Sequence, residues 1–311
     1  MVVFAMVFPG QGSQTVGMLT KLSKIYMKVK ETFSEASDVL GYDLWQLVQR
    51  GPTEKLNQTE QTQPALLATS VAIWRIWQEQ NGNIPAFMAG HSLGEYSALV
   101  CSGSLDFITG IKIVALRGTL MQNAAPVGTG AMAAIIGLDN DIVTLICKQS
   151  ELGRIVSPVN FNYPGQVVIA GHKDAVERAS ISCKKAGAKR VLSLSVSVPS
   201  HCALMKPAEE KLAQALNAIT FDIPKIPVIN NVNARIENNP TAIRQALIYQ
   251  LCNPVRWTET IEHFNALGVK RVLELGPGNI LTKLNKRIIS TLISIAVNDP
   301  TSLATAISKQ N

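Results

Sequence analysis

The chain has 311 residues, of which 47% are hydrophobic, enough to bury a large core in one domain or in two unequal ones. Its five cysteines are widely spaced and lack a C-x-x-C pair, which argues against a disulfide framework or a zinc site and favours the reducing cytoplasm. The net charge of +7 suits an anionic cofactor, an acidic protein or nucleic acid, but no aromatic-rich RNA signature or zinc-finger spacing accompanies it, so we expect no nucleic-acid partner.

The first part of the chain alternates short apolar runs with longer helical patterns. Val2 to Phe8 and Ala86 to Ala89 are strand-like, whereas Gln63 to Gln80 and Glu95 to Val100 are helix-like. That alternation predicts an α/β fold with a largely parallel sheet. Together with the serine turn described below, it leads us to expect a large subdomain of the α/β-hydrolase-like kind.

None of these apolar stretches has the character of a signal or membrane segment. The run that ends at Phe8 lacks a basic region and a cleavage site, and Arg75 interrupts the apolar stretch from Leu66 to Trp77, which falls short of the ~20 residues that cross a bilayer. We therefore expect a soluble protein without membrane association.

The middle of the chain has a different order of elements, β-α-β-β-α-β, which is the ferredoxin-like pattern. Pro126 to Gly130 and Pro199 are breaker signals on either side of it. We therefore predict a discontinuous large subdomain of residues 1–125 and 199–311, with residues 126–198 inserted as a small ferredoxin-like subdomain. The predicted elements of the insert are strand Ala131 to Gly137, helix Asp139 to Ser150, strands Ile155 to Asn160 and Gln166 to Gly171, helix Asp174 to Ala186 and strand Lys189 to Ser195.

Beyond Pro199 the large subdomain resumes. Its predicted elements are helix Leu204 to Ala218, strand Pro227 to Asn231, helices Thr241 to Leu251 and Trp257 to Leu267, strand Arg271 to Leu275, helix Asn279 to Ser290 and strand Leu292 to Ala296.

A glycine-flanked serine, Gly90-x-Ser92-x-Gly94, lies between the strand-like run and the helix-like one. That context is the one a nucleophile elbow requires, in which a sharp turn exposes the serine oxygen at a helix N-terminus. The alternative is a glycine-rich turn in which Ser92 only caps the helix.

A serine hydroxyl needs a base to become a nucleophile, and the chain has four histidines, His91, His172, His201 and His263. His201 follows Val198-Pro199-Ser200 in the loop that re-enters the large subdomain, which makes it the best candidate by position. One of Asp106, Asp139, Asp141 or Asp174 would supply the acid of a triad, and a carbonyl or amide that orients the histidine would give a dyad instead.

Several separated motifs together resemble the bacterial malonyl-CoA:acyl-carrier-protein transacylases over almost the full length. They are Phe8-Pro9-Gly10-Gln11-Gly12-Ser13-Gln14, Gly90-His91-Ser92-Leu93-Gly94-Glu95, Ala115-Leu116-Arg117-Gly118, Asn162 to Gly171, Val198-Pro199-Ser200-His201, Gln250 and Glu274-Leu275-Gly276-Pro277-Gly278.

The resemblance implies roles for the residues in these motifs. Ser92 is then the acylated serine and His201 its base, held by the backbone carbonyl of Gln250, so that a dyad is preferred. The backbone N–H groups of Gln11 and Leu93 would form the oxyanion hole. The substrate-binding residues would be Arg117, Gln250 and Asn162, with the planar guanidinium of Arg117 gripping the malonyl carboxylate.

The resemblance therefore implies ping-pong transfer of a malonyl group from malonyl-CoA to the thiol of an acidic acyl carrier protein, in fatty-acid biosynthesis. We expect a monomer that needs no cofactor and no metal. The cluster of basic residues Lys184, Lys185, Lys189 and Arg190 would attract the phosphates of coenzyme A or the acidic carrier protein. The rival functions are an esterase or thioesterase that uses the same Ser92 with water as acceptor, and a catalytically silent carrier-protein binding module.

Overall fold

Strand β1 (Phe4–Phe8) shows why this sequence forms a sheet that is covered on both faces. All five of its residues are buried. Phe4, Met6 and Phe8 belong to one hydrophobic core and the two residues between them to another, because side chains alternate between the faces of a strand. Each fully buried large apolar side chain contributes about 1.5–3 kcal/mol relative to exposure.

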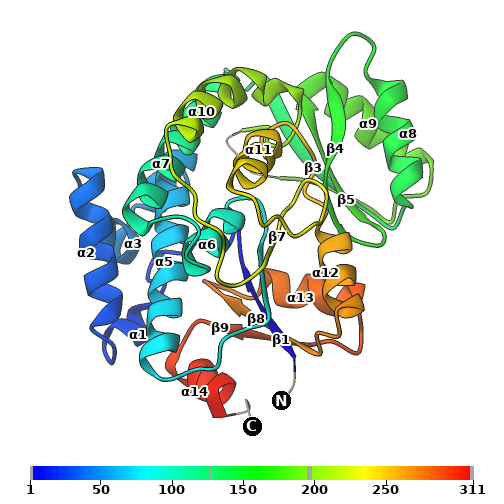
Figure 1. Ribbon diagram of the computed structural model, residues 1–311. Helices are drawn as coiled ribbons and strands as arrows, with labels where there is room; N and C mark the ends of the chain where they lie inside the picture. The colour runs from blue at the N-terminus through cyan, green and yellow to red at the C-terminus, as the bar shows by residue number, and fades with distance from the viewer. Residues whose placement is uncertain (1–2, 127, 195–197, 309–311) are drawn as a thin grey trace.

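A computed structural model of the chain describes residues 3–126, 128–194 and 198–308. Two sheets organise it (Figure 1). The first sheet is parallel, and β1 pairs with a strand on each side. Its order is β7 (Val228–Ile229), β2 (Phe87–Gly90), β1, β8 (Arg271–Leu275) and β9 (Ile293–Val297).

Helices cover the parallel sheet on both faces. Residues of α12 (Trp257–Ala266) and α13 (Ile280–Ile288) pack with Ala5 and Val7 on one face. The other face carries a larger helical layer, seen beside the sheet in Figure 1. Its helices are α1 (Thr20–Ser23), α2 (Lys28–Leu40), α3 (Leu44–Arg50), α4 (Thr53–Leu56), α5 (Thr59–Glu79), α6 (Gly94–Cys101), α7 (Phe107–Ala124), α10 (Lys206–Asn217) with the preceding 3-10 turn Ala203–Met205, α11 (Pro240–Gln250) and α14 (Pro300–Ser308).

The second sheet is antiparallel and comes from the middle of the chain. Its order is β4 (Val156–Tyr163), β5 (Gln166–His172), β3 (Gly130–Ile136) and β6 (Arg190–Ser193). Helices α8 (Asn140–Ser150) and α9 (Lys173–Lys185) pack on one face of it. The other face, which includes Met132 and Val168, packs around Cys202 and is turned toward the parallel sheet.

The predicted fold class is confirmed, because the chain has a parallel sheet and a separate sheet with the ferredoxin-like strand order. The predicted elements match observed ones, although Val2 and Ser195, at the ends of two predicted strands, lie outside the described residues. Four helices occupy residues 20–56, where no element is predicted, and no range is predicted for α7 or α14. Helix α5 begins at Thr59 instead of Gln63, so Pro64 lies inside it.

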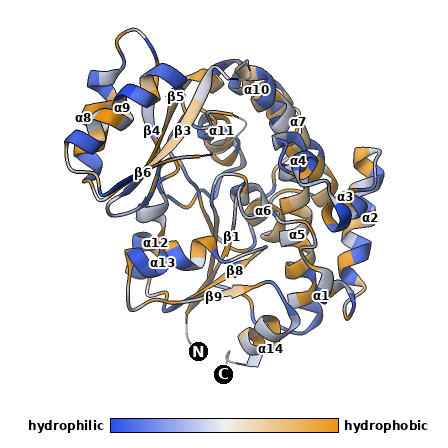
Figure 2. Cartoon of the chain, turned by 180° about the vertical axis from the view of Figure 1, so that it is seen from behind, coloured by the Kyte–Doolittle hydropathy of each residue, from blue (hydrophilic) through white to orange (hydrophobic). Residues whose placement is uncertain are grey.

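Hydropathy follows this layering. In Figure 2 the strands of both sheets carry much of the hydrophobic colour, and α2 shows bands of both colours because it buries one side only. Among the described helices, none combines the length and the apolar character that a membrane span requires.

Candidate active site

Ser92 lies on the sharp turn that joins β2 to α6. Its φ of 53° is in the left-handed region, which costs about 1–2 kcal/mol for a residue with a side chain. A Cβ on Gly90 would lie 1.8 Å from the carbonyl carbon of Gly94, and a Cβ on Gly94 would lie 2.0 Å from the carbonyl oxygen of Phe8. Only glycine at these two positions allows the strand and the helix to approach so closely, which places Ser92 at the end of the sheet.

The side chain of Asn231, just after β7, holds this turn from the other side. The Ser92 backbone N–H donates to Asn231 Oδ1 over 2.7 Å, and Asn231 Nδ2 donates to the carbonyl oxygen of Gly90 over 2.6 Å. Asn231 is fully buried. One amide side chain therefore stabilises the strained backbone on both sides of His91.

His201 meets the serine hydroxyl directly. Its Nε2 lies 2.7 Å from Ser92 Oγ, and its Nδ1 lies 2.7 Å from the backbone carbonyl oxygen of Gln250, at the end of α11. A carbonyl oxygen only accepts, so Nδ1 carries the proton and Nε2 is free to accept one from the serine. Burial, with a further contribution from the positive charge of Arg117, lowers the pKa of His201 to about 3, which keeps the ring neutral at physiological pH.

Arg117, on α7, places a cation beside the same hydroxyl. It is 1% exposed, and its Nη2 lies 3.4 Å from Ser92 Oγ and 3.0 Å from Gln250 Oε1, while Nη1 donates to Gln63 Oε1 over 2.9 Å. These acceptors are neutral. Within the described part of the chain Arg117 forms no ion pair, so its guanidinium is available to a carboxylate that enters the site.

A cavity of about 120 Å³ opens over these groups, and a larger pocket of about 410 Å³ adjoins it. Gln11 lines both, Leu93 lines the smaller one and Asn162 lines the larger one. The small cavity is lined by Gln11, His91, Ser92, Leu93, Arg117, Met121, Met132, Asn160, Leu194, Val198, Ser200 and His201. Its walls therefore come from both sheets, with the nucleophile on one side and Met132 and Asn160 on the other.

Comparison with known proteins identifies the type of molecule that has this site. The family model described as "Acyl transferase domain" matches residues 5–307. The chain belongs to the acyl transferase domain family.

Individual relatives are similar over their whole length. The chain is 60% identical to the malonyl CoA-acyl carrier protein transacylase of Escherichia coli K12 over 307 residues, 99% of each chain, and 63% identical to that of Haemophilus influenzae over 297 residues, 95% of each. A solved malonyl-transacylase in complex with its type II PKS acyl-carrier protein is 63% identical with a TM-score of 0.98, covering 99% of this chain and 100% of that one. An acyl carrier protein S-malonyltransferase from Vibrio cholerae is 62% identical with a TM-score of 0.96, covering 97% and 99%. The predicted resemblance is confirmed.

The other three histidines of this acyl transferase have partners away from the Ser92 hydroxyl. His91 lies beside the nucleophile, but its Nε2 is 3.0 Å from Asn162 Oδ1 and its ring packs on Trp257. His172 Nδ1 accepts from the backbone N–H of Ile155, and His263 Nδ1 lies 2.8 Å from the carbonyl oxygen of Ala234. His201 is thus the histidine in contact with the serine.

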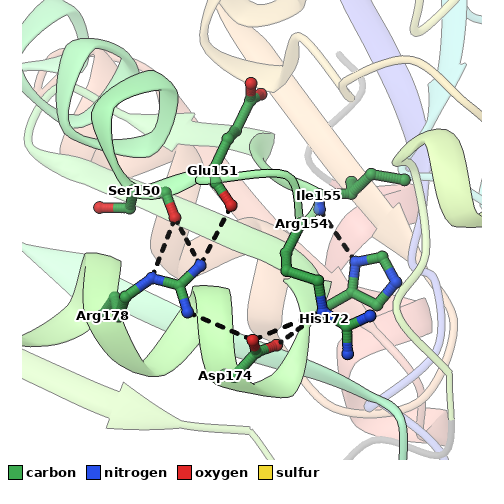
Figure 3. A network of polar contacts seen from close by, with 7 residues as sticks. All are labelled: Ser150, Glu151, Arg154, Ile155, His172, Asp174 and Arg178. Carbon is green, nitrogen blue, oxygen red and sulfur yellow. Dashed lines mark hydrogen bonds and ion pairs between the residues drawn. The ribbon is translucent and has the colours of Figure 1, made fainter.

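The candidate acids are likewise placed elsewhere. Asp106 and Asp139 cap the N-termini of α7 and α8, and Asp141 lies exposed in the first turn of α8. Asp174 forms ion pairs with Arg154 and Arg178, and Figure 3 shows this network at the junction of α8 and α9. In the described residues His201 is therefore oriented by the Gln250 carbonyl and not by a carboxylate.

Sequence reasoning missed the polar groups behind the turn. Glu95 is 2% exposed and accepts from the backbone N–H of Asn231 and from Gln250 Nε2, and burial raises its pKa to about 7. The sequence does point to Glu95, because it begins a run of small and apolar residues, and a carboxyl group is rarely buried in such a run unless it has a partner. Asn231 gave no such signal, because it is only the last residue of a predicted strand.

The described residues do not gather metal-binding side chains into a cluster. Within residues 3–126, 128–194 and 198–308 there is no group of three or more His, Cys, Asp or Glu side chains that could hold one. The five cysteines are unpaired and four of them are buried.

Proposed function

We propose that this acyl transferase moves a malonyl group from malonyl-CoA to the phosphopantetheine thiol of an acyl carrier protein through a malonyl-Ser92 intermediate, in fatty-acid biosynthesis. The observation that carries the proposal is the position of Ser92 Oγ, 2.7 Å from His201 Nε2 and 3.4 Å from Arg117 Nη2. A neutral base on one side and an unpaired cation on the other suit an acyl group that ends in a carboxylate. The names of the relatives support the same activity.

In the first half-reaction Ser92 Oγ attacks the thioester carbonyl carbon and its proton passes to His201 Nε2. The oxyanion accepts hydrogen bonds from the backbone N–H groups of Gln11 and Leu93, which line the cavity. The C–S bond then breaks, and the proton on His201 passes to the sulfur, so that coenzyme A leaves as a thiol. Arg117 holds the malonyl carboxylate during these steps.

The second half-reaction reverses the first with another thiol. The phosphopantetheine thiol gives its proton to His201 Nε2 and attacks the acyl carbon, and Ser92 Oγ takes the proton back as it leaves. The apolar side chains Met121, Met132, Leu194 and Val198 line the cavity and limit water near the ester. The larger pocket, whose wall includes Asn162 and Gln166, would receive the arm that carries the thiol.

The proposal includes the division into subdomains 1–125 with 199–311, and 126–198. The strands of the parallel sheet all come from the first two segments and those of the antiparallel sheet from the third, which supports it. We further propose that the protein acts as a monomer and needs no cofactor in addition to its substrates. Its unpaired cysteines support a place in the cytoplasm.

Intact-mass measurement of the purified protein after exposure to malonyl-CoA tests this function. The wild type should gain the mass of one malonyl group and lose it when a carrier protein with a free phosphopantetheine thiol is added. Ser92→Ala should gain nothing. Loss of the group to water at the same rate with and without the carrier protein would indicate a hydrolase instead.

A further inference from the structure

Glu95 lies one turn beyond the nucleophile and faces away from the substrate cavity into the polar cluster behind it. Its Oε2 accepts two hydrogen bonds, from the backbone N–H of Asn231 over 3.0 Å and from Gln250 Nε2 over 2.8 Å. These donors come from the segment after β7 and from α11. A single carboxyl oxygen therefore ties α6 to two other parts of the chain.

Each of the two donor residues holds catalytic groups in turn. Asn231 accepts from the Ser92 backbone N–H. Gln250 uses three separate groups: Nε2 also donates to the carbonyl oxygen of Ser92 over 3.0 Å, Oε1 accepts from Arg117, and its backbone carbonyl contacts His201. The nucleophile, the base and the cation are all within two hydrogen bonds of Glu95.

We propose that Glu95 is a positioning residue of this acyl transferase, whose Oε2 fixes Asn231 and Gln250 so that Ser92, His201 and Arg117 keep their relative geometry. This inference rests on the proposed function. It adds a residue that touches neither the substrate nor the reacting atoms.

Stability alone does not account for a carboxyl group at this position. Glu95 is 2% exposed and forms no direct ion pair with any residue that the structure describes, since Gln250 lies between it and Arg117. Burying a carboxyl group without an opposite charge beside it is costly, whereas an apolar side chain of similar volume carries no such cost. Nor does Glu95 cap its own helix, because both contacts of Oε2 are to other segments.

Two variants separate the acceptor from the charge. Glu95→Gln keeps the reach and one carbonyl oxygen that can accept both hydrogen bonds, whereas Glu95→Met keeps the volume and removes the acceptor. Both remove the charge. Glu209→Gln and Glu209→Met are matched controls, because Glu209 is a buried carboxyl on α10 that pairs with Lys206 and contacts none of the active-site residues described above.

The assay measures the rate of malonyl-Ser92 formation by rapid-quench intact mass, the ratio of malonyl to acetyl loading, and the melting temperature. We expect Glu95→Gln to keep most of the loading rate and its malonyl preference. Glu95→Met should load on the order of 100-fold more slowly, because small displacements of catalytic groups cost that much. It should also lose malonyl preference, since Gln250 no longer fixes Arg117.

Several outcomes would overturn the proposal. One is a Glu95→Met protein that loads malonyl as fast as Glu209→Met, and another is an equal loss in Glu95→Gln and Glu95→Met, which would point to the charge. If Glu95→Met does not fold, Glu95→Asp takes its place, since it keeps the charge and withdraws the oxygen by one methylene. A wild type that fails to load malonyl at all would instead refute the proposed function.

Discussion

Replacing Arg117 by Met removes the cation beside the nucleophile while nearly preserving the buried volume. Malonyl loading should fall sharply and acetyl loading should not, because acetyl has no carboxylate for the guanidinium to bind. The substitution also leaves the side-chain oxygens of Gln63 and Gln250 without the donor they contact in the native protein.

The size of the effect follows from the burial of the site. Removing one partner of a desolvated, hydrogen-bonded charge pair costs about 2–5 kcal/mol, and each 1.36 kcal/mol is a factor of ten in rate. We therefore expect kcat/KM for malonyl-CoA to fall roughly 30- to 5,000-fold relative to the value for acetyl-CoA. For the free energy of unfolding, two hydrogen bonds to Gln63 and Gln250 are lost, and this loss opposes the gain from removing a buried charge that has no ion-pair partner among the described residues.

The measurement is kcat/KM for both acyl-CoAs in wild type, Arg117→Met and a control, Arg75→Met. Arg75 lies on α5, pairs with Glu35 over 2.7 Å and has no contact with Ser92 or His201 among those described, so its loss should leave the malonyl-to-acetyl ratio unchanged. If Arg117→Met lowers malonyl and acetyl transfer by the same factor, Arg117 does not bind the malonyl carboxylate and the reasoning fails.

Two further results are expected. Burial and the charge of Arg117 lower the pKa of His201 to about 3, and the neutral ring is the active form, so the loading rate should stay constant from pH 8 to pH 5. A base with a pKa of 6.5 would lose roughly 30-fold in rate over this range, and such a loss in the wild type would contradict the expectation. In Arg117→Met the pKa of His201 should rise. Gly94→Ala, whose Cβ would meet the Phe8 carbonyl oxygen at 2.0 Å, should lower the free energy of unfolding in urea by about 3 kcal/mol. Gly41→Ala, where no atom lies within 4 Å and only positive φ opposes a side chain, should cost about 1–2 kcal/mol, and equal losses would refute the steric argument.

Much of the two sheets was predictable because strands such as β1, β3 and β9 consist mainly of apolar residues. Buried strands such as β1 and β8 and the β-α-β-β-α-β order of the insert are visible in the residue pattern alone. The helices of residues 20–56 are harder to find, since they are short or largely polar. Helix α2 does carry a stripe at helical spacing, Val29, Phe33 and Ala36, which indicates a helix that buries one side.

Some active-site residues can likewise be identified from the sequence, whereas others cannot. The flanking glycines and the strand-helix context single out Ser92, and a loop position favours His201, but residue types alone left the orienting group open. A backbone carbonyl has no sequence signature, so the contact between Gln250 and His201 was implied only by family resemblance. The polar cluster of Glu95, Asn231 and the Gln250 side chain depends on three segments that meet in space, which no local pattern encodes.

The central position of β1 in the parallel sheet determines when the active site can assemble during synthesis of the chain. Ala5 pairs with Phe87 on one side and with Val272 on the other, so a strand made before Ser92 is completed by one made long after it. Such long-range pairing slows folding, and chains emerge from the N-terminus. A nascent chain that already carries Ser92 still lacks Asn231, Gln250 and β8. It therefore cannot gain acyl transferase activity before β8 has been synthesised.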